Sequence, residues 1–287
     1  PHHADKHAPL HVQYCETKRR KENVVKKRNV LRELLNDGEP TIGTQVINAS
    51  PQIVEVIGQT GQFSYVQLSG EYSSWTLPDL DNFARAVELF PSMTAVMKIE
   101  DEPRTFITRR ALHAGMQGML FSDCSSAADV KECIRAVRPS TPEDGGTNGC
   151  SMTRDVGFLI TEVGSEAWMQ AMRDIVIMVM VEKQEMMDEL EEILAMDEVD
   201  MVNFGPCDFS VSVGKAFNSS RWCTEAYRAH RDMLELALKY KKRARVEIWN
   251  YEQAREYIDM GVRDFNVGVD LLAIYEYCRE NGGGVRG

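Results

Sequence analysis

Two apolar runs decide the fold: Val176-Ile-Met-Val-Met-Val-Glu182-Lys183 and Met201-Val-Asn-Phe-Gly-Pro-Cys-Asp208-Phe-Ser210. Each run is as long as a buried strand, and each ends in a carboxylate, Glu182 or Asp208. Between them lies a charged stretch with helical periodicity, residues 186–194. The pattern predicts a strand, a helix and a second strand that pairs in parallel with the first. Because the carboxyl ends of such strands lie side by side, we expect the two acids to meet at one edge of the sheet.

Two carboxylates at neighbouring strand ends are suited to a hard divalent cation. Mg²⁺ and Mn²⁺ prefer oxygen ligands, and Glu182 and Asp208 would supply them. The alternative is that each acid caps the N-terminus of the helix that follows it. The residues alone leave both interpretations open.

The rest of the chain repeats the alternation of strand-like and helical patterns. Further apolar runs that read as strands lie at residues 41–47, 63–68, 94–99, 118–121, 245–249 and 264–268. This alternation predicts parallel strands wrapped by helices, and the length of 287 residues suits one (β/α)₈ barrel. A doubly wound open sheet fits the pattern almost as well. Its dinucleotide-binding version is disfavoured, because no Gly-x-Gly-x-x-Gly follows the first strand.

We assign the barrel to residues 30–287 and a flexible, charged arm to residues 1–29. The arm holds four of the six histidines, His2, His3, His7 and His11, and we expect no catalytic role for them. Strands five and six are hard to place, because residues 139–152 form a long loop rich in Pro, Gly and Ser. We expect a function for this loop, since long loops in compact barrels are rarely idle.

Composition excludes several classes of protein. With 43% hydrophobic residues the chain can build a large core, and its formal net charge of −11 argues against nucleic-acid binding. No apolar run reaches the roughly 18 to 20 residues of a membrane span, and no secretory leader is recognised. The seven cysteines contain no Cys-x-x-Cys pair, which is typical of reduced thiols. We therefore expect a cytoplasmic protein.

The two acidic strand ends resemble the metal-binding core of the HpcH/HpaI aldolase family. In that family the aspartate of a Gly-Pro-x-Asp-Leu-Ser turn follows the glutamate by 26 positions. Here Asp208 follows Glu182 by 26 positions, and the turn reads Gly205-Pro-Cys-Asp-Phe-Ser210. The resemblance covers roughly residues 40 to 275. It implies a (β/α)₈ barrel, a homo-oligomer that exchanges its last helix between subunits, a divalent cation and a pyruvate-type 2-oxo acid.

The resemblance extends to the segment after the second strand, Ser69-Gly-Glu71-Tyr72, and implies catalytic positions there. The family has Asp-x-Glu-His here, and its Asp–His pair transfers the proton. Ser69 and Tyr72 replace both members, whereas Glu71 is retained. As a catalytic candidate Glu71 would hydrogen-bond backbone or metal-bound water, and the alternative is a structural role. Tyr72 either acts as an acid or only forms a wall of the pocket. An ordinary tyrosine pKa near 10 makes it a poor base at neutral pH.

Lys98 stands where the family has an arginine that binds the carboxylate of the 2-oxo acid. Lysine keeps the charge but loses the two-pronged geometry of a guanidinium group. We therefore expect Lys98 to bind an anion, with an ion pair to Glu100 or Glu182 as the alternative. A Schiff-base role is disfavoured, because nearby carboxylates raise the pKa of a lysine.

Three further positions complete the predicted pocket. Met180 replaces a glutamine that is common in the family, and Cys207 stands where the family has a small residue whose N–H faces the substrate. Arg154 follows the long loop and either supplies a displaced positive charge or faces solvent.

These residues predict a metal-dependent carbon–carbon lyase, an aldolase, that acts on a 2-oxo acid through a stabilised pyruvate enolate, with an aldehyde as second partner. One alternative is decarboxylation or hydrolysis of a 2-oxo acid at the same site. The other is a catalytically inactive barrel that serves as a binding subunit. The departures from the family at Ser69, Tyr72, Lys98 and Met180 all fall on the pocket, which indicates changed substrate or chemistry around a retained metal site.

Overall fold

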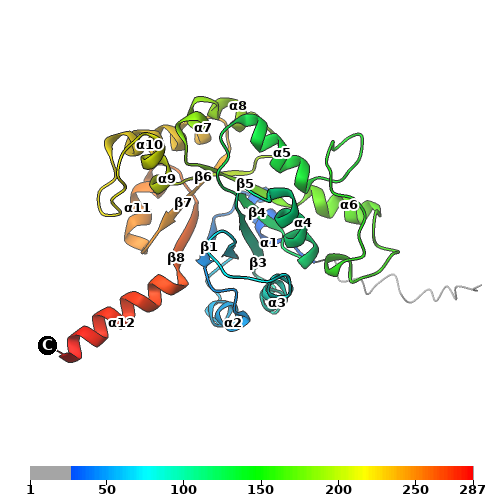
Figure 1. Ribbon diagram of the computed structural model, residues 1–287, viewed down its shortest axis with the longest axis horizontal. Helices are drawn as coiled ribbons and strands as arrows, with labels where there is room; N and C mark the ends of the chain where they lie inside the picture. Colours follow the sequence, from blue (N-terminus) through cyan, green and yellow to red (C-terminus); the bar gives the residue numbers. More distant parts are fainter. Residues whose placement is uncertain (1–26, 287) are drawn as a thin grey trace, which may run out of the picture.

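The computed structural model describes residues 27–286, whose eight parallel strands close into a barrel (Figure 1). The strands follow one another in chain order, and the last pairs with the first through Thr41 and Asp264. They are β1 (Thr41–Val46), β2 (Tyr65–Ser69), β3 (Thr94–Ile99), β4 (Gly118–Phe121), β5 (Val176–Val181), β6 (Met201–Phe204), β7 (Arg243–Ile248) and β8 (Asp264–Val269). The predicted (β/α)₈ barrel is thereby confirmed and the open sheet excluded. The histidines of the predicted arm lie outside the described residues.

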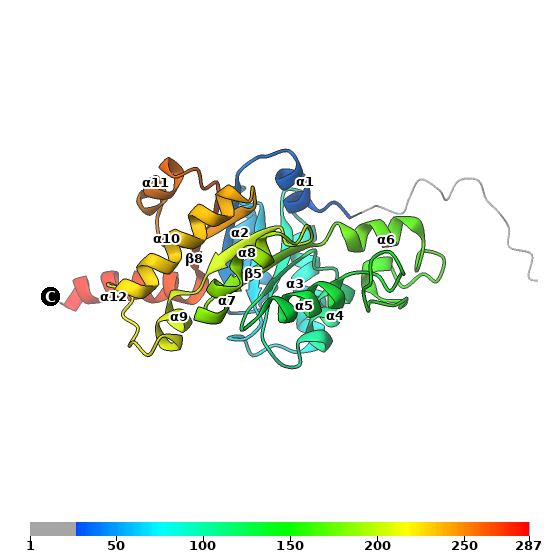
Figure 2. The ribbon, with the colours of Figure 1, turned by 90° about the horizontal axis from the view of Figure 1, so that it is seen from above.

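The helices lie outside the sheet, and most of them surround the barrel (Figures 1 and 2). They are α1 (Val30–Asn36), α2 (Pro51–Gln59), α3 (Leu77–Glu88), α4 (Arg104–Ala114), α5 (Ala127–Val137), the 3₁₀ turn η1 (Arg154–Val156), α6 (Glu166–Arg173), α7 (Gln184–Asp188), α8 (Leu190–Leu194), α9 (Pro206–Ser212), α10 (Thr224–Lys239), α11 (Tyr251–Asp259) and α12 (Asp270–Arg286). The helix expected over residues 186–194 is thus two short helices that meet at Glu189. Among the described residues no helix is long and apolar enough to cross a membrane.

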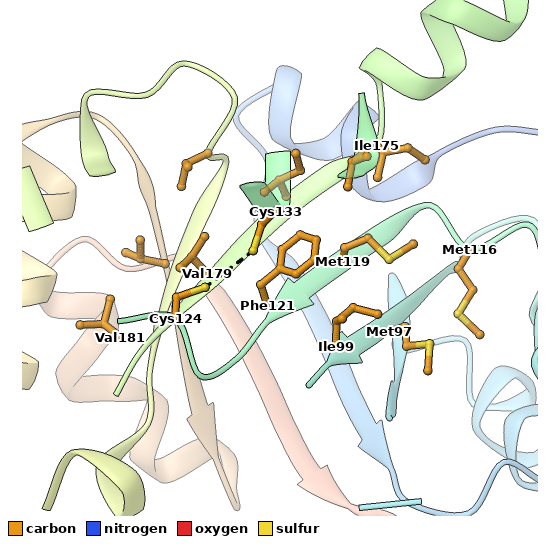
Figure 3. Close-up of a cluster of buried hydrophobic side chains, with 14 of the residues drawn as sticks. Met97, Ile99, Met116, Met119, Phe121, Cys124, Cys133, Ile175, Val179 and Val181 are labelled. Atoms are coloured by element: carbon orange, nitrogen blue, oxygen red, sulfur yellow. Dashed lines mark hydrogen bonds between the residues drawn. The ribbon is translucent and has the colours of Figure 1, made fainter. Parts of the chain in front are cut away.

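Side chains alternate between the inside and the outside of the barrel, because successive residues of a strand point to opposite faces. Outward-facing residues pack against the helices. Figure 3 shows this layer over β3, β4 and β5, where Phe121 and Val179 lie close to Cys133 of α5, and Ile99 belongs to the same cluster. The inward-facing residues form a separate buried cluster that includes Tyr65, Val96, Leu120, Met178, Met180 and Met201.

The amino-terminal mouth of the barrel is closed by α1. Leu31 is fully buried in the interior cluster, and Asn29 caps the helix while donating to the carbonyls of Gln117 and Asp174 at 2.9 and 3.0 Å. The opposite mouth, at the carboxyl ends of the strands, is therefore where a cavity can open.

The long loop of residues 139–152 follows α5 and precedes β5. A segment that leads from a helix into a strand lies at the amino-terminal face of the barrel. In barrels of this type the loops that follow the strands carry the chemistry. The expectation that this loop serves the site is therefore not supported.

Candidate active site

The carboxyl ends of neighbouring strands bring polar side chains together in the open mouth. Inward-facing positions recur every second residue, so β5 carries Met178, Met180 and then Glu182 at its rim. Together with Asp208 in the first turn of α9, Glu182 borders an acidic cavity of about 340 Å³. The cavity is lined by Glu71, Tyr72, Glu100, Asp101, Glu102, Asp123, Glu182 and Asp208.

Glu182 is a buried carboxylate with few stabilising partners. Its exposed fraction is 1%, and it accepts a hydrogen bond from the backbone N–H of Asp123. Burial raises the pKa of Glu182 to about 7, with Asp208 adding to the rise and the Asp123 amide and Lys98 opposing it. An additional positive charge at this point would offset the cost of burying the Glu182 carboxylate and its repulsion by Asp208.

Gly205 makes room for Glu182. A Cβ at position 205 would lie 2.6 Å from Glu182 Oε2, closer than real side chains approach. The helix-cap alternative is not supported for Glu182, because its carboxylate accepts from the Asp123 amide and Lys183 is the residue that precedes α7.

Glu182 and Asp208 fit a hard divalent cation, because they place carboxylate oxygens on one cavity. Within residues 27–286 no group of three or more His, Cys, Asp or Glu side chains is arranged to hold a metal ion. Water and substrate oxygens would have to supply the remaining ligands, as is usual for Mg²⁺.

Lys98 forms a buried ion pair with Glu71. Its side chain is 6% exposed, and Nζ donates to a Glu71 carboxylate oxygen and, at 3.1 Å, to the Tyr72 hydroxyl. Burial alone would lower the pKa of Lys98, but Glu71 and Tyr72 raise it well above its usual range. Lys98 therefore stays protonated, and its partner is neither of the two acids, Glu100 and Glu182, that the sequence suggested.

Glu71 is held at both oxygens, since its second oxygen accepts from Ser122 Oγ at 2.8 Å. Burial would raise the pKa of Glu71, but the charge and hydrogen bond of Lys98 lower it below its ordinary value. The carboxylate therefore stays ionised and positions Lys98.

Tyr72 lies on the wall of the acidic cavity with 54% of its surface exposed. Burial of its hydroxyl end raises the pKa to about 12, which Lys98 opposes and Glu71 reinforces. Tyr72 therefore carries its proton at neutral pH and can donate it, but cannot act as a base.

Ser69, Lys98, Met180 and Cys207 are not among the residues that line this cavity, although Lys98 contacts two that do, Glu71 and Tyr72. Ser69 is fully buried and accepts a hydrogen bond from Gln45 Nε2 at 3.2 Å. Met180 belongs to the interior cluster beneath Glu182. Cys207 is an exposed residue. Partial desolvation of its thiol and the charges of Asp208 and Glu182 raise the pKa of that thiol, so a thiolate is disfavoured.

Arg154 is not brought to the site, and its predicted substrate contact is wrong. It pairs with Glu88 at the end of α3 and donates to the carbonyl of Ala114 at the end of α4, at 2.5 Å. Both helices end at the amino-terminal face, because the next strand begins there.

Several residues of the site were not predicted, among them Ser122 and Asp123, which contact Glu71 and Glu182. The two-residue period of β4 places Ser122 inward after Gly118 and Leu120, so the pattern contained this signal. Asp123 has a φ of 58°, a left-handed conformation that aspartate tolerates better than most residues, and its N–H donates to Glu182. Such backbone geometry clusters at functional sites but has no clear sequence pattern.

Comparison with known proteins places this geometry in context. The sequence profile of the HpcH/HpaI aldolase/citrate lyase family matches residues 79–275. A hydroxypyruvate/pyruvate aldolase of Delftia acidovorans is 26% identical over 258 residues, covering 90% of this chain and 93% of the relative. A 5-keto-4-deoxy-D-glucarate aldolase of an Enterobacter species is 27% identical over 85% of this chain and 91% of the relative. A family protein from Burkholderia cenocepacia superposes with a TM-score of 0.79 at 23% identity, over 91% of this chain and 100% of that one, and supports the fold alone.

Proposed function

The chain belongs to the HpcH/HpaI aldolase/citrate lyase family, and we propose from this that it is a divalent-cation-dependent aldolase acting on a pyruvate-type 2-oxo acid. Relatives named as aldolases of hydroxypyruvate and pyruvate, or of 5-keto-4-deoxy-D-glucarate, support a lyase that cleaves carbon–carbon bonds. The observation that carries the proposal is Glu182, buried with a pKa raised to about 7, on the same cavity as Asp208.

In this proposal Glu182 and Asp208 hold Mg²⁺ or Mn²⁺. When bound, the cation supplies the positive charge that stabilises a developing enolate oxygen. The Asp123 amide orients Glu182, and Gly205 leaves the space that its carboxylate needs.

Lys98 and Tyr72 act on the substrate itself. Lys98, held by Glu71, donates to the carboxylate of the 2-oxo acid. During cleavage the substrate hydroxyl loses its proton and becomes the aldehyde carbonyl. The carbon–carbon bond breaks, and the electron pair of that bond is delocalised onto the 2-oxo oxygen as the enolate. Tyr72 is protonated and positioned to return a proton to the enolate carbon. No described histidine lines this cavity, so the hydroxyl proton passes to one of its carboxylates, directly or through water.

A second reaction, decarboxylation of a 2-oxo acid, would use the same residues. Tyr72 and Ser69 are the reason to consider decarboxylation. A tyrosine with a pKa of about 12 and a buried serine cannot together replace the acid/base pair of the family, which aldol cleavage uses to move the proton. Loss of CO₂ leaves an enolate and needs no base to remove a hydroxyl proton. Hydrolysis at the same site would require an activated water instead.

One experiment separates these functions. The protein is incubated with pyruvate and Mn²⁺ in D₂O, and the methyl signal of pyruvate is followed by NMR. Methyl exchange that is abolished by a chelator supports enolate chemistry, and a panel of aldehydes and of 2-oxo diacids then separates aldol from decarboxylase activity. Absence of exchange with every substrate would leave a binding subunit as the better description.

The proposal includes a homo-oligomer that exchanges α12 between subunits. This helix points away from its own barrel (Figure 2), and its apolar residues Ile274, Tyr275 and Tyr277 are exposed. Beside β8 and β1 an apolar groove of about 370 Å³ remains, where Ile42 is 41% exposed next to Phe265. A second copy of α12 would cover this groove. Light scattering of wild type and of Ile274→Glu tests the exchange, because the charged variant should shift the oligomer to monomer.

A further inference from the structure

Lys183 directly follows Glu182 and reaches across to the loop after β4. Its ammonium group donates to the backbone carbonyl of Asp123 at 2.9 Å and to Ser125 Oγ at 3.3 Å. The Asp123 carboxylate lies farther away, at 3.7 Å from Lys183 Nζ, and the lysine side chain is 29% exposed. The shortest contact of Lys183 is therefore with the backbone of Asp123 rather than with its charge, and the proposed reaction gives this lysine no role.

Asp123 has a backbone conformation that costs free energy. Its φ of 58° lies in the left-handed region, which residues with a Cβ rarely adopt, although aspartate tolerates it better than most. Such a conformation persists where the surrounding contacts hold it. Two consecutive residues at the end of β5 supply contacts of this kind. The Asp123 N–H donates to the Glu182 carboxylate, and the Asp123 carbonyl accepts from Lys183, so the peptide groups on both sides of its Cα are held.

The Asp123 N–H has a task at the acidic cavity, because it orients the buried carboxylate of Glu182 on the cavity that Asp208 also borders. If the Asp123 carbonyl lost its donor, the backbone could leave the left-handed region and the N–H would turn away from Glu182. We propose that Lys183 is a positioning residue that holds Asp123 in this conformation and thereby keeps the Glu182 carboxylate in the orientation that binds a divalent cation. This inference rests on the proposed function, to which the cation belongs.

The charge of Lys183 and its hydrogen bond act on a bound cation in opposite directions. An ammonium group near the cavity repels a divalent cation, so its removal would strengthen cation binding through charge alone. Loss of the hydrogen bond would weaken binding, because the support of a ligand is removed. The sign of the change in affinity therefore distinguishes positioning from simple electrostatics.

Lys183→Met removes the charge and the donor but keeps a long unbranched side chain. The affinity for Mn²⁺, measured by calorimetric titration, should fall about tenfold, the lower end of what is lost when the support around a metal ligand is removed. Lys183→Arg keeps the charge and supplies N–H donors of similar reach, and it should restore most of the affinity. The matched control is Lys131→Met, an exposed lysine of α5 that pairs with Glu192, and it should bind Mn²⁺ as wild type does. An affinity of Lys183→Met equal to or above that of wild type would overturn the inference.

A second pair of variants tests the conformation of Asp123 itself. Asp123→Asn and Asp123→Val both remove the carboxylate, so they change the charge of the cavity equally. Asparagine tolerates the left-handed region, whereas a β-branched residue is an outlier there. Mn²⁺ affinity should therefore be about tenfold lower in Asp123→Val than in Asp123→Asn. Equal affinities in the two folded variants would also overturn the inference. If circular dichroism shows that Asp123→Val is unfolded, the variants of Lys183 decide.

Amide hydrogen exchange separates this inference from the proposed function, because it needs no added cation. The Asp123 amide should exchange about threefold to tenfold faster in Lys183→Met than in wild type, as expected when a supporting hydrogen bond is lost. Equal exchange rates would contradict the positioning role. If the rates differ but wild type binds no Mn²⁺, the cation-dependent aldolase fails while the contact between Lys183 and Asp123 keeps its positioning role. If wild type and Lys183→Met bind Mn²⁺ equally, the inference fails and the aldolase stands.

Discussion

The ammonium group of Lys98 donates to the carboxylate of Glu71 inside the mouth of the barrel, where both side chains are largely buried. The pair leaves the acidic cavity with carboxylates in excess, since Glu182, Asp208 and Asp123 also border it. An anionic substrate is therefore expected to bind well only when a cation occupies the cavity. Lys98 contributes a further hydrogen bond from an ammonium that Glu71 keeps protonated.

Lys98→Ala should weaken the binding of pyruvate far more than that of Mn²⁺. A charge-assisted hydrogen bond contributes roughly 1.5 to 3 kcal/mol, so we expect pyruvate affinity to fall about tenfold to a hundredfold. Calorimetry with Mn²⁺ alone, and then with pyruvate on the Mn²⁺-loaded protein, measures the two effects separately. Because the variant leaves Glu71 buried without its partner, Lys98→Ala with Glu71→Gln serves as the control for local disorder. A change of less than about twofold in both proteins would make Lys98 a structural residue only.

Asp208→Ala should abolish the binding of divalent cations while the barrel remains folded. Asp208 is exposed in the first turn of α9, so its removal costs little packing, whereas the cation loses one of two protein carboxylates. Calorimetric titration with Mn²⁺ and circular dichroism measure the two outcomes. The matched control is Asp232→Ala, an exposed aspartate on α10. Equal Mn²⁺ affinity in the two variants would exclude Asp208 as a ligand.

Gly205→Ala should reduce Mn²⁺ affinity through Glu182. The added Cβ would lie 2.6 Å from Glu182 Oε2 and 2.7 Å from Glu182 Cβ, so the carboxylate must move. We expect a loss of at least about tenfold in affinity, comparable to the loss of support around a metal ligand. Gly149→Ala is the control, because a Cβ there meets no atom within 4 Å. Mn²⁺ titrations in which both alanine variants match wild type would contradict the role of Gly205.

Local patterns in the sequence predicted parallel strands wrapped by helices and the pair of strand-end acids, whereas the preference for a barrel over an open sheet also depended on the family resemblance. A short apolar run that ends in Glu182, a helical stretch and a second run that leads to Asp208 already place the two carboxylates together. The contact of Lys98 with Glu71 was not predicted, because several acids lie near the strand ends and the pattern does not say which of them a flexible lysine contacts. The prediction for Arg154 was wrong because the segment that holds it lies between a helix and a strand, and the order of elements puts such a segment at the opposite face.

His230 should make the protein less stable at mildly acidic pH. His230 lies in α10 and is buried against Phe204 and Trp222. Burial lowers its pKa to about 4, whereas a histidine in the unfolded chain has a pKa near 6.5. Above about pH 6.5 neither state binds the proton. As the pH falls toward 4, only the unfolded state takes it up, so the free energy of unfolding falls, by roughly 2 kcal/mol at pH 5.

Urea unfolding at pH 7.5 and pH 5.0 measures this effect in wild type and in His230→Phe, which keeps an aromatic ring beside Phe204. The loss of stability between the two pH values should be smaller in the variant, because the other titrating groups are common to both proteins. Equal losses would show that His230 is not the responsible group.

Tyr72→Phe distinguishes a proton donor from a wall of the pocket. The phenylalanine keeps the ring that lies 4.7 Å from Lys98 Nζ but removes the hydroxyl that Lys98 contacts at 3.1 Å. If Tyr72 returns the proton to the enolate, release of pyruvate in the cleavage direction should slow by roughly 10² to 10⁴, the usual contribution of a positioned acid. Pyruvate affinity should change much less. Since the pKa of Tyr72 is about 12, its acid form persists through neutral and mildly alkaline pH, and the residue should cause no decline in pyruvate release between pH 7 and pH 10. Pyruvate release by Tyr72→Phe at the wild-type rate would leave Tyr72 as a wall of the cavity and transfer the proton donation to solvent.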